Sequence, residues 1–313
     1  MEVADVMPIL GAGRFEVRST LGAGGAGIVY RAFDRQLNRD VALKLLRHAS
    51  GRDLYRFKKE FRALADIVHP NLVALHELHA SDDDWYFTME LVEGESFIDW
   101  VRPSPHAGPS RTRQDILAAP VHEMRLRGAL VQLIDALIAL HDAGKLHRDL
   151  KPSNVLVTPQ GRVALLDFGL VSNVAEDNPE RLAVGTPVYM SPEQASDQPL
   201  GEASDWYSLG AMIYEALTGR RPFEGNSEEV MTRKQSELPL DPRQLAPTAP
   251  PDLARLCMLL LQPSPGARPN GHGILGMLGA TPSARTRDMA RTAMPPSFVG
   301  RGRELEELRN ALA

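Results

Sequence analysis

The glycine-rich segment at residues 22–27, of sequence GAGGAG, is a candidate phosphate-binding loop. The pattern Gly-x-Gly-x-x-Gly is a weak signal alone, and in a dinucleotide-binding fold such a loop follows a strand and opens a helix. Here the next residues, 28–33, read IVYRAF and have the composition of a strand. We therefore expect the loop to turn a β-hairpin whose backbone folds over phosphates.

Lys44 ends a second β-type run, residues 41–44 of sequence VALK, and is a candidate phosphate ligand. A lysine at the end of an apolar strand is commonly a solvated edge residue. Downstream of a glycine-rich loop, the same lysine can reach phosphate oxygens as a point charge. Glu60, in the helical stretch that follows, is either a surface charge or the partner that holds Lys44 in place.

The most specific signal is the run HRDLKPSN at residues 147–154, followed by DFG at residues 167–169. With these motifs the chain resembles the eukaryotic-type (Hanks-type) bacterial serine/threonine protein kinases over residues 15–278. The resemblance implies an α+β, bilobal protein-kinase fold: a small β-rich N-lobe with one regulatory helix, and a larger α-helical C-lobe. It also implies transfer of the γ-phosphoryl group of MgATP to serine or threonine hydroxyls of protein substrates, in signal transduction. The alternative is a catalytically inactive kinase-fold scaffold, although no catalytic motif residue is missing.

The resemblance assigns catalytic roles to four polar residues. Asp149 would orient and deprotonate the substrate hydroxyl, and Lys151 would neutralise the transferring phosphoryl group. A lysine at position 151 resembles the serine/threonine branch of the family. Lys44 would hold the ATP phosphates, with Glu60 as its partner.

The resemblance also implies two bound cofactors, ATP and Mg²⁺. Asn154 and Asp167 would bind Mg²⁺, a hard ion that prefers carboxylate, amide and phosphate oxygens. The ATP-binding residues would be Leu21, Gly22, Gly24, Gly27, Val29, Ala42, Lys44, Met89, Glu90, Val92 and Leu156. Each apolar residue of this set is also a candidate core residue, and the resemblance alone favours the ATP-binding role.

Other motif matches imply structural roles. Residues 191–193 (SPE) stand where the family has Ala-Pro-Glu, and Arg268 resembles the arginine that pairs with this glutamate. Asp205 resembles the aspartate that holds the catalytic-loop backbone, and residues 185–186 (GT) resemble the loop that distinguishes Ser/Thr substrates. The stacked column that links the two lobes in the family is matched by Leu64, Leu75, His147 and Phe168.

Arg148 matches the family arginine that usually grips a phosphorylated residue of the activation segment. Ser172 is the only hydroxyl side chain in residues 170–185. The carboxylate of Glu180, or failing it Glu176, would give Arg148 a partner without modification. Solvated loop acids are an equally good reading of both residues.

The elements that must position these residues follow from periodicity. Short β-type runs at residues 27–33, 41–46 and 85–91 predict a small sheet, and residues 53–67 predict a helix against it. A long apolar stripe then predicts a C-lobe helix, with Leu130, Leu133, Ile134, Leu137, Ile138 and His141 on one face.

The prediction divides the chain into an N-terminal extension (1–14), an N-lobe (15–92), a C-lobe (93–280), a linker (281–297) and a tail (298–313). Residues 103–120, rich in proline, predict an exposed loop between two helices. The tail, beginning FVGR, resembles the start of a P-loop ATPase module in a longer protein, or is a terminal amphipathic helix.

Composition limits the function classes. With 43% hydrophobic and 24% charged residues, the chain should bury a packed core. A net charge of −5 argues against nucleic-acid or anionic-membrane coating, and the kinase resemblance implies protein substrates as the partners. Cys257 is the single cysteine and lies in an apolar run, so no internal disulfide can form. Together with the lack of a leader or membrane segment, this predicts a cytoplasmic protein.

Overall fold

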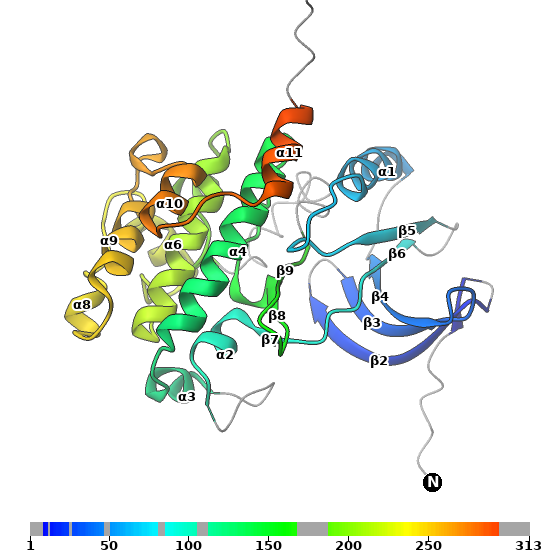
Figure 1. The fold of residues 1–313 in the computed structure, drawn as a ribbon, viewed down its shortest axis with the longest axis horizontal. Helices are drawn as coiled ribbons and strands as arrows, with labels where there is room; N and C mark the ends of the chain where they lie inside the picture. The colour runs from blue at the N-terminus through cyan, green and yellow to red at the C-terminus, as the bar shows by residue number, and fades with distance from the viewer. Residues whose placement is uncertain are drawn as a thin grey trace, which may run out of the picture.

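A small antiparallel sheet with one helix forms one lobe, and a larger set of helices forms the other (Figure 1). The structure, a computed structural model, describes residues 9–11, 13–24, 27–46, 51–80, 85–104, 112–167 and 187–293. This arrangement confirms the predicted bilobal α+β fold.

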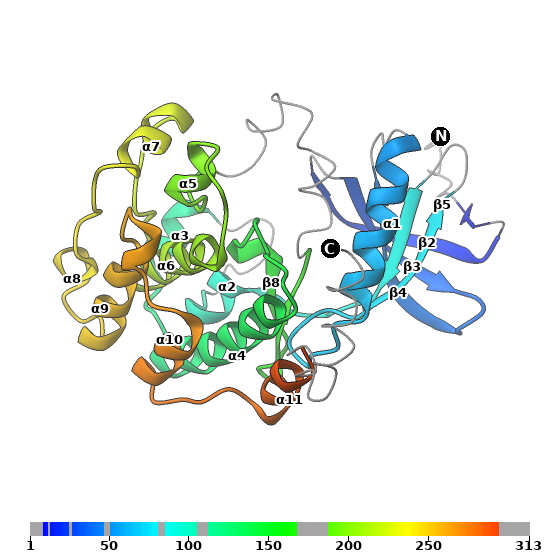
Figure 2. The same cartoon turned by 90° about the horizontal axis from the view of Figure 1, so that it is seen from above.

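The small lobe is a sheet of the order β1-β2-β3-β4-β6-β5. Its strands are β1 (Ile9–Leu10), β2 (Phe15–Gly24), β3 (Gly27–Asp34), β4 (Arg39–Leu46), β5 (Leu75–Ala80) and β6 (Trp85–Met89). Helix α1 (Gly51–Ala65) packs against β5 on one face of this sheet (Figure 2). The predicted strands and helix are confirmed, with ends shifted by a few residues.

The two faces of the sheet bury different clusters, because side chains alternate along a strand. Leu43 and Tyr86 lie in a cluster on one face. Ala42, Phe87 and Met89 belong to the main core on the other face, which α1 covers with side chains three and four residues apart, Phe57, Phe61 and Leu64. Phe61 and Phe87 have ring centroids 5.6 Å apart.

The glycine-rich segment joins β2 to β3 as an antiparallel hairpin, with Gly24 opposite Gly27. Gly27 has a φ of +144°, and a Cβ there would lie 2.0 Å from the carbonyl oxygen of Leu45. Only glycine lets β3 and β4 approach this closely. The hairpin, and not a dinucleotide-binding loop, is therefore what the segment forms.

The large lobe combines helices with a small sheet of β7 (Glu95–Ser96), β8 (Val155–Val157) and β9 (Val163–Leu165). Its helices are α2 (Phe97–Val101), α3 (Arg113–Ala118), α4 (Glu123–Asp142), η1 (Pro152–Asn154), α5 (Pro192–Ala195), α6 (Glu202–Thr218), α7 (Ser227–Arg233), α8 (Pro242–Leu245), α9 (Pro251–Leu260), η3 (Pro265–Ala267), α10 (Gly271–Met277) and α11 (Ala284–Ala293).

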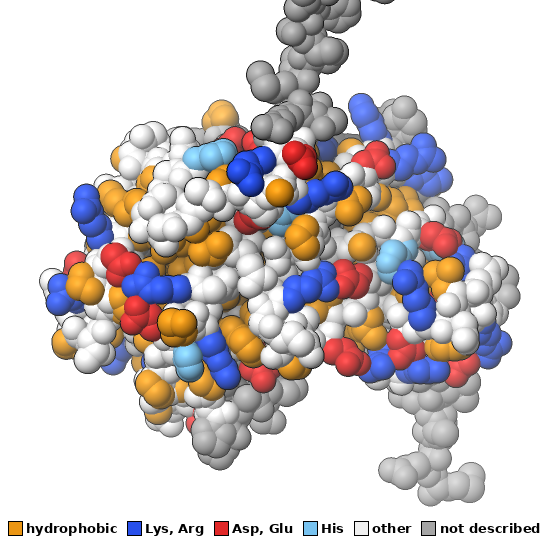
Figure 3. Space-filling model, in the orientation of Figure 1, with side chains coloured by type: hydrophobic (Ala, Val, Ile, Leu, Met, Phe, Trp, Pro, Cys, Tyr) orange, Lys and Arg blue, Asp and Glu red, His pale blue; other side chains and the backbone are white. Residues whose placement is uncertain are grey.

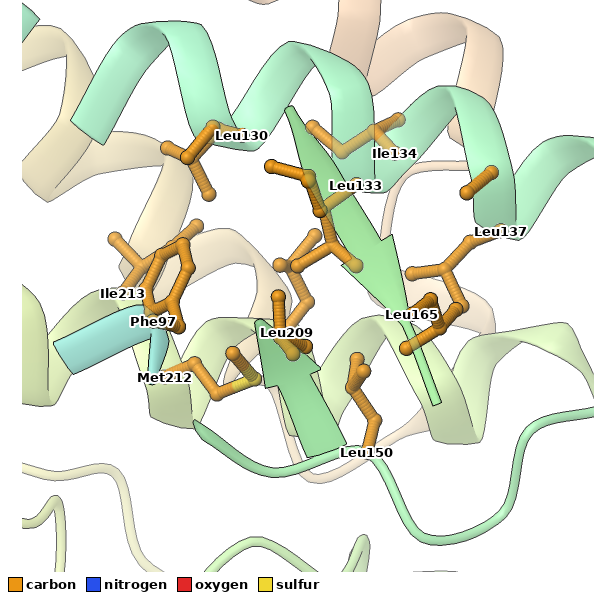
Figure 4. Close-up of a cluster of buried hydrophobic side chains, with 14 of the residues drawn as sticks. Phe97, Leu130, Leu133, Ile134, Leu137, Leu150, Leu165, Leu209, Met212 and Ile213 are labelled. Carbon is orange, nitrogen blue, oxygen red and sulfur yellow. The ribbon is translucent and has the colours of Figure 1, made fainter. Parts of the chain in front are cut away.

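The core of the large lobe lies between α4 and α6. Figure 4 shows Leu130, Leu133 and Leu137 of α4 beside Leu209 and Met212 of α6, all within one buried cluster. The predicted apolar stripe of α4 is confirmed, because its members are buried here. The strands β8 and β9 are held against this core, and the catalytic motif residues lie at their ends.

The proline-rich stretch at residues 103–120 was predicted as a loop, and the prediction is wrong for α3. Thr112 and Asp115 form a reciprocal capping box at the start of this helix. Arg102, which is buried, donates to the carbonyl oxygen of Ile116 at 2.9 Å and to that of Ala216 at 2.8 Å. Capping and one buried arginine stabilise a helix that has almost no apolar stripe.

Within the predicted linker at residues 281–297, the structure places helix α11 against α4 (Figures 1 and 2). Its packing is polar, which is why periodicity did not reveal it. The tail at residues 298–313 lies outside the described residues, so its two readings, and the domain boundaries, stay predictions. Within the part of the chain that the structure describes, no helix has the length and hydropathy needed to cross a membrane.

Candidate active site

Lys44 lies at the junction of the two lobes, on the sheet face that carries the main core. Val29 and Phe87 are its neighbours in the β3 and β6 register. Its Nζ is 2.7 Å from Oδ1 of Asp167, and the side chain is only 4% exposed. Burying an ammonium group is costly unless it is paired. The ion pair therefore fixes Lys44 of the small lobe beside Asp167, which follows β9 of the large lobe.

Glu60 is a half-buried residue of α1, next to the buried Phe61. The ion pair described for Lys44 joins it to Asp167. The pairing of Lys44 with Glu60 therefore stays a prediction.

Asp149 is held by the residues that follow it. Its Oδ2 accepts hydrogen bonds from Nζ of Lys151 at 2.7 Å and from Nδ2 of Asn154 at 3.1 Å. Nδ2 of Asn154 also donates to the carbonyl oxygen of Asp149 at 2.8 Å. The Asp149 side chain is 48% exposed, so a hydroxyl group from solvent can reach the carboxylate.

The β8–β9 hairpin brings Asn154 and Asp167 together. The amide of Leu166 donates to the carbonyl oxygen of Asn154 at 2.8 Å, and Asp167 is the next residue. Because the Asn154 amide nitrogen is used by Asp149, its side-chain oxygen is the atom left for a cation. A carboxylate and an amide oxygen form the kind of hard donor set that Mg²⁺ prefers, so these residues fit the predicted metal.

Asp205 fixes the backbone of the two residues that precede Asp149. Its two carboxylate oxygens accept from the amides of His147 and Arg148, at 2.8 and 2.9 Å. Oδ2 also meets Nε2 of His141 at 2.8 Å. Burial alone would raise the pKa of Asp205, but the hydrogen bond with His141 and the backbone donor hold it below its usual value. The carboxylate therefore stays charged while fully buried.

Two non-glycine residues of the site have left-handed backbone conformations. Arg148 has a φ of 66° and Asp167 a φ of 54°. Each such residue costs about 1–3 kcal/mol and persists only where its surroundings enforce it. Asp205 enforces the first and the ion pair with Lys44 restrains the second. Nε2 of His147 bonds the carbonyl oxygen of Leu166 at 2.9 Å and so joins the two strained segments.

The match at residues 191–193 forms a buried ion pair. Arg268 contacts both carboxylate oxygens of Glu193, at 2.7 and 2.9 Å. Gln194, which the motif analysis missed, donates from Nε2 to the carbonyl oxygen of Arg148 at 2.7 Å. The sequence signal for Gln194 was its spacing from Ser191, which forms a capping box with it.

The residues predicted for ATP binding lie in two groups. Val29, Ala42, Lys44 and Met89 share one sheet face, since Val29 pairs with Lys44 and Ala42 with Met89. Leu156 lies on β8, in the large lobe. Within the first group the structure brings together an apolar surface and one ammonium group.

The remaining candidates differ in their surroundings. Leu21 is half-exposed, and no atom lies within 4 Å of a Cβ built on Gly22. The Glu90 side chain turns to Arg162, at 2.5 Å, so only its backbone is left for a nucleotide. Val92 packs at the edge of the main core.

Several predicted residues lie outside the described residues. They are Phe168 and Gly169 of the DFG motif, Ser172, Glu176 and Glu180, and the pair at 185–186. Leu64 and Leu75 both pack in the main core, but the predicted column through Phe168 stays a prediction.

Residues 15–277 match the protein kinase domain family, and the chain therefore belongs to that family. It is 37% identical to serine/threonine-protein kinase pkn2 of Myxococcus xanthus, over 87% of this chain and 33% of the relative. It is 34% identical to the DNA damage-responsive serine/threonine-protein kinase RqkA of Deinococcus radiodurans, over 95% of this chain and 45% of the relative. It is 32% identical to PknA of Mycobacterium tuberculosis, over 91% and 65%. The chain thus spans between one third and just under two thirds of these relatives.

Proposed function

We propose that this chain transfers the γ-phosphoryl group of ATP, with Mg²⁺, to serine or threonine hydroxyls of protein substrates in signal transduction. The observation that carries the proposal is the 2.7 Å ion pair between Lys44 and Asp167 at the lobe junction. It joins an ammonium group, which can bind phosphate, to a carboxylate, which can bind a metal ion. The large lobe, which carries this carboxylate, also carries the exposed carboxylate of Asp149. The names of the three relatives support serine and threonine as acceptors.

The residues present account for positioning and charge, which are the main demands of phosphoryl transfer. ATP and Mg²⁺, when bound, supply the transferable group and neutralise part of its charge. Lys44 holds phosphate oxygens, and Asn154 and Asp167 hold the ion. Asp149 orients the substrate hydroxyl and accepts its proton.

Lys151 has two partners in this scheme. In the structure its Nζ lies 2.7 Å from Oδ2 of Asp149. A flexible ammonium group at this place can turn to the transferring phosphoryl oxygens and stabilise their charge. The contact with Asp149 keeps it beside the reaction centre before transfer.

The proposed partners are proteins, and the proposed location is the cytoplasm, where ATP is available. Figure 3 shows cationic and anionic side chains interspersed on one face, in keeping with a net charge of −5. Cys257 is fully buried, and burial raises the pKa of its thiol well above the usual value. An inert thiol of this kind is compatible with a reducing compartment.

The test is to incubate the purified chain with ATP, Mg²⁺ and myelin basic protein, and to identify the phosphorylated amino acids by mass spectrometry. We expect phosphoserine or phosphothreonine, and at least about a hundredfold less of either with Asp149→Asn. ATP binding without any transfer would instead favour the scaffold alternative. Phosphotyrosine as the main product would contradict the proposed acceptor.

A further inference from the structure

Lys234 is a fully buried lysine at the end of α7, and its partners are backbone carbonyl oxygens. Its Nζ donates to Pro187 and, at 2.6 Å, to Met190, and it lies 3.5 Å from the carbonyl oxygen of Val188. Among the residues that the structure describes, no ion pair with a carboxylate is formed by this lysine. Within the described part of the chain, the hydrogen bonds of its ammonium group all go to residues 187–190.

A buried ammonium without a counter-ion is costly, so its contacts must offset the loss of water. The carbonyl dipoles supply part of that stabilisation. The ring of Tyr207, with its centroid 5.6 Å from Nζ, adds a cation–π contact. In return, the ammonium group fixes the direction of backbone carbonyls at both ends of residues 187–190.

The segment 187–190 is linked to the Asp149 loop through helix α5. It leads directly into Ser191 and α5, where Gln194 bonds the carbonyl oxygen of Arg148, the residue before Asp149. On its other side, Ser208 of α6 donates to the carbonyl oxygen of Tyr189 at 2.8 Å. The Tyr189 hydroxyl donates to Glu215. Helices α6 and α7 therefore hold the segment from two directions.

A protein that presents a hydroxyl to Asp149 must lay its neighbouring residues on the adjoining surface. We propose that Lys234 is a positioning residue for the protein substrate: it holds residues 187–190 in the backbone conformation that receives the residues flanking the acceptor hydroxyl. This inference rests on the proposed kinase function. It assigns Lys234 to recognition of the protein and not to ATP binding or proton transfer.

The same contacts predict a dependence on pH. Burial lowers the pKa of Lys234 to about 7. Loss of the proton leaves an amine with fewer N–H donors for the carbonyls. Ionisable side chains on the surrounding elements are Tyr189, Glu193, Tyr207, Glu215 and Arg268.

Where the surroundings shift the pKa of one of these neighbours, they move it away from neutral pH. Burial raises the pKa of Tyr189 and of Tyr207, while hydrogen bonding to Arg268 outweighs burial and lowers that of Glu193. We therefore expect the KM for protein to rise as the pH passes about 7, through Lys234.

The experiment compares the wild-type chain with Lys234→Met and Lys234→Gln. The matched control is Arg233→Met, which removes a neighbouring cation that forms an exposed ion pair with Glu237. Steady-state kinetics are measured with myelin basic protein and with ATP from about pH 6.5 to about pH 8.5, and ATP hydrolysis is measured without protein. Folding is monitored by thermal unfolding.

We expect Lys234→Met to raise the KM for protein about tenfold, a loss of about 1.4 kcal/mol. The KM for ATP and the hydrolysis rate should stay within about twofold of wild type, as they should for Arg233→Met. Lys234→Gln keeps two N–H donors, so its KM for protein should lie between those of wild type and Lys234→Met. Because glutamine does not titrate, the KM of this variant should not rise above about pH 7. If Lys234→Met fails to fold, the inference is tested by the dependence of the KM for protein on pH in Lys234→Gln.

An unchanged KM for protein in a folded Lys234→Met chain would overturn the inference. So would a KM rise with pH in Lys234→Gln that equals the wild-type rise. Absence of transfer by the wild-type chain would instead contradict the proposed function, so the two failures are distinguishable.

Discussion

The imidazole of His69 lies 3.1 Å from the hydroxyl of Thr286, although 217 positions separate them in the chain. The same Nε2 atom lies 3.1 Å from Oδ2 of Asp135 in α4. Arg285 of α11 donates to the carbonyl oxygen of Val68 at 3.0 Å. Helix α11, which lies beyond the residues that match the kinase family, therefore binds the segment leading from α1 to β5.

Removing the Thr286 hydroxyl should destabilise this contact. Thr286 is 1% exposed, and Thr286→Val keeps its shape while leaving His69 and Ser283 without one partner. We expect the free energy of unfolding to fall by about 1–2 kcal/mol. Denaturant unfolding measures it, with the exposed Thr281→Val as the control. Equal stabilities of the two variants would show that the hydroxyl contributes nothing.

Asp135 should make the fold sensitive to acid. Burial would raise its pKa, but the hydrogen bond with His69 and those from Ser283 and Thr286 lower it to about 2. Because this lies below the unfolded value, Asp135 stabilises the fold above about pH 4 and loses that contribution as the pH falls toward 2.

The variant Asp135→Asn tests this contribution. It should be less stable than wild type by about 2 kcal/mol near neutral pH, and the difference should shrink below about pH 4. Unfolding by denaturant at several pH values gives both numbers. A difference that is independent of pH would contradict the assignment.

Asp205 should act on turnover through the backbone of the Asp149 loop. In Asp205→Asn one acceptor oxygen becomes a donor that faces the amides of His147 and Arg148. We expect kcat to fall about a hundredfold, because the carboxylate of Asp149, the proposed proton acceptor, is misplaced, while the affinity for ATP changes little. Glu228→Gln, an exposed change on α7, is the control. An equal loss of ATP affinity would point to general unfolding instead.

Lys44→Met should strongly slow phosphoryl transfer and leave the fold intact. The side chain pairs with Asp167, whose 27% exposure lets water solvate the carboxylate after the change. The expected loss in kcat is about 10²–10³-fold, the cost of one well-placed charged donor. Lys59→Met, which replaces an exposed lysine of α1, serves as the control in the same kinetic assay. Circular dichroism checks that both variants are folded. Near-normal turnover in a folded Lys44→Met chain would rule out the assigned role.

The sequence predicted those parts of the fold whose signals are local. Leu130, Leu133 and Leu137 recur at helical spacing, and the motif around Asp149 is contiguous, so α4 and the position of the Asp149 loop could be predicted. Helix α11 was not, because it is attached through pairs such as His69 and Thr286 that no periodicity records.

The missed parts of the site have the same explanation. Gln194 acts on the carbonyl of Arg148, and Lys234 acts on the carbonyls of residues 187–190. A lysine within a polar run reads as a solvated side chain until the fold buries it. Such contacts join elements far apart in the chain, and only the three-dimensional structure reveals them.

The proposed site is tested most directly by the rate of phosphoryl transfer by Asp149→Asn, measured at ATP concentrations that give the same occupancy as in wild type. Asp149 is exposed and contacts Lys151 and Asn154, so the substitution keeps the loop while removing the proposed proton acceptor. We expect unchanged ATP affinity and a transfer rate at least about a hundredfold lower. A transfer rate equal to that of wild type would contradict the assignment of Asp149, and with it the proposed site.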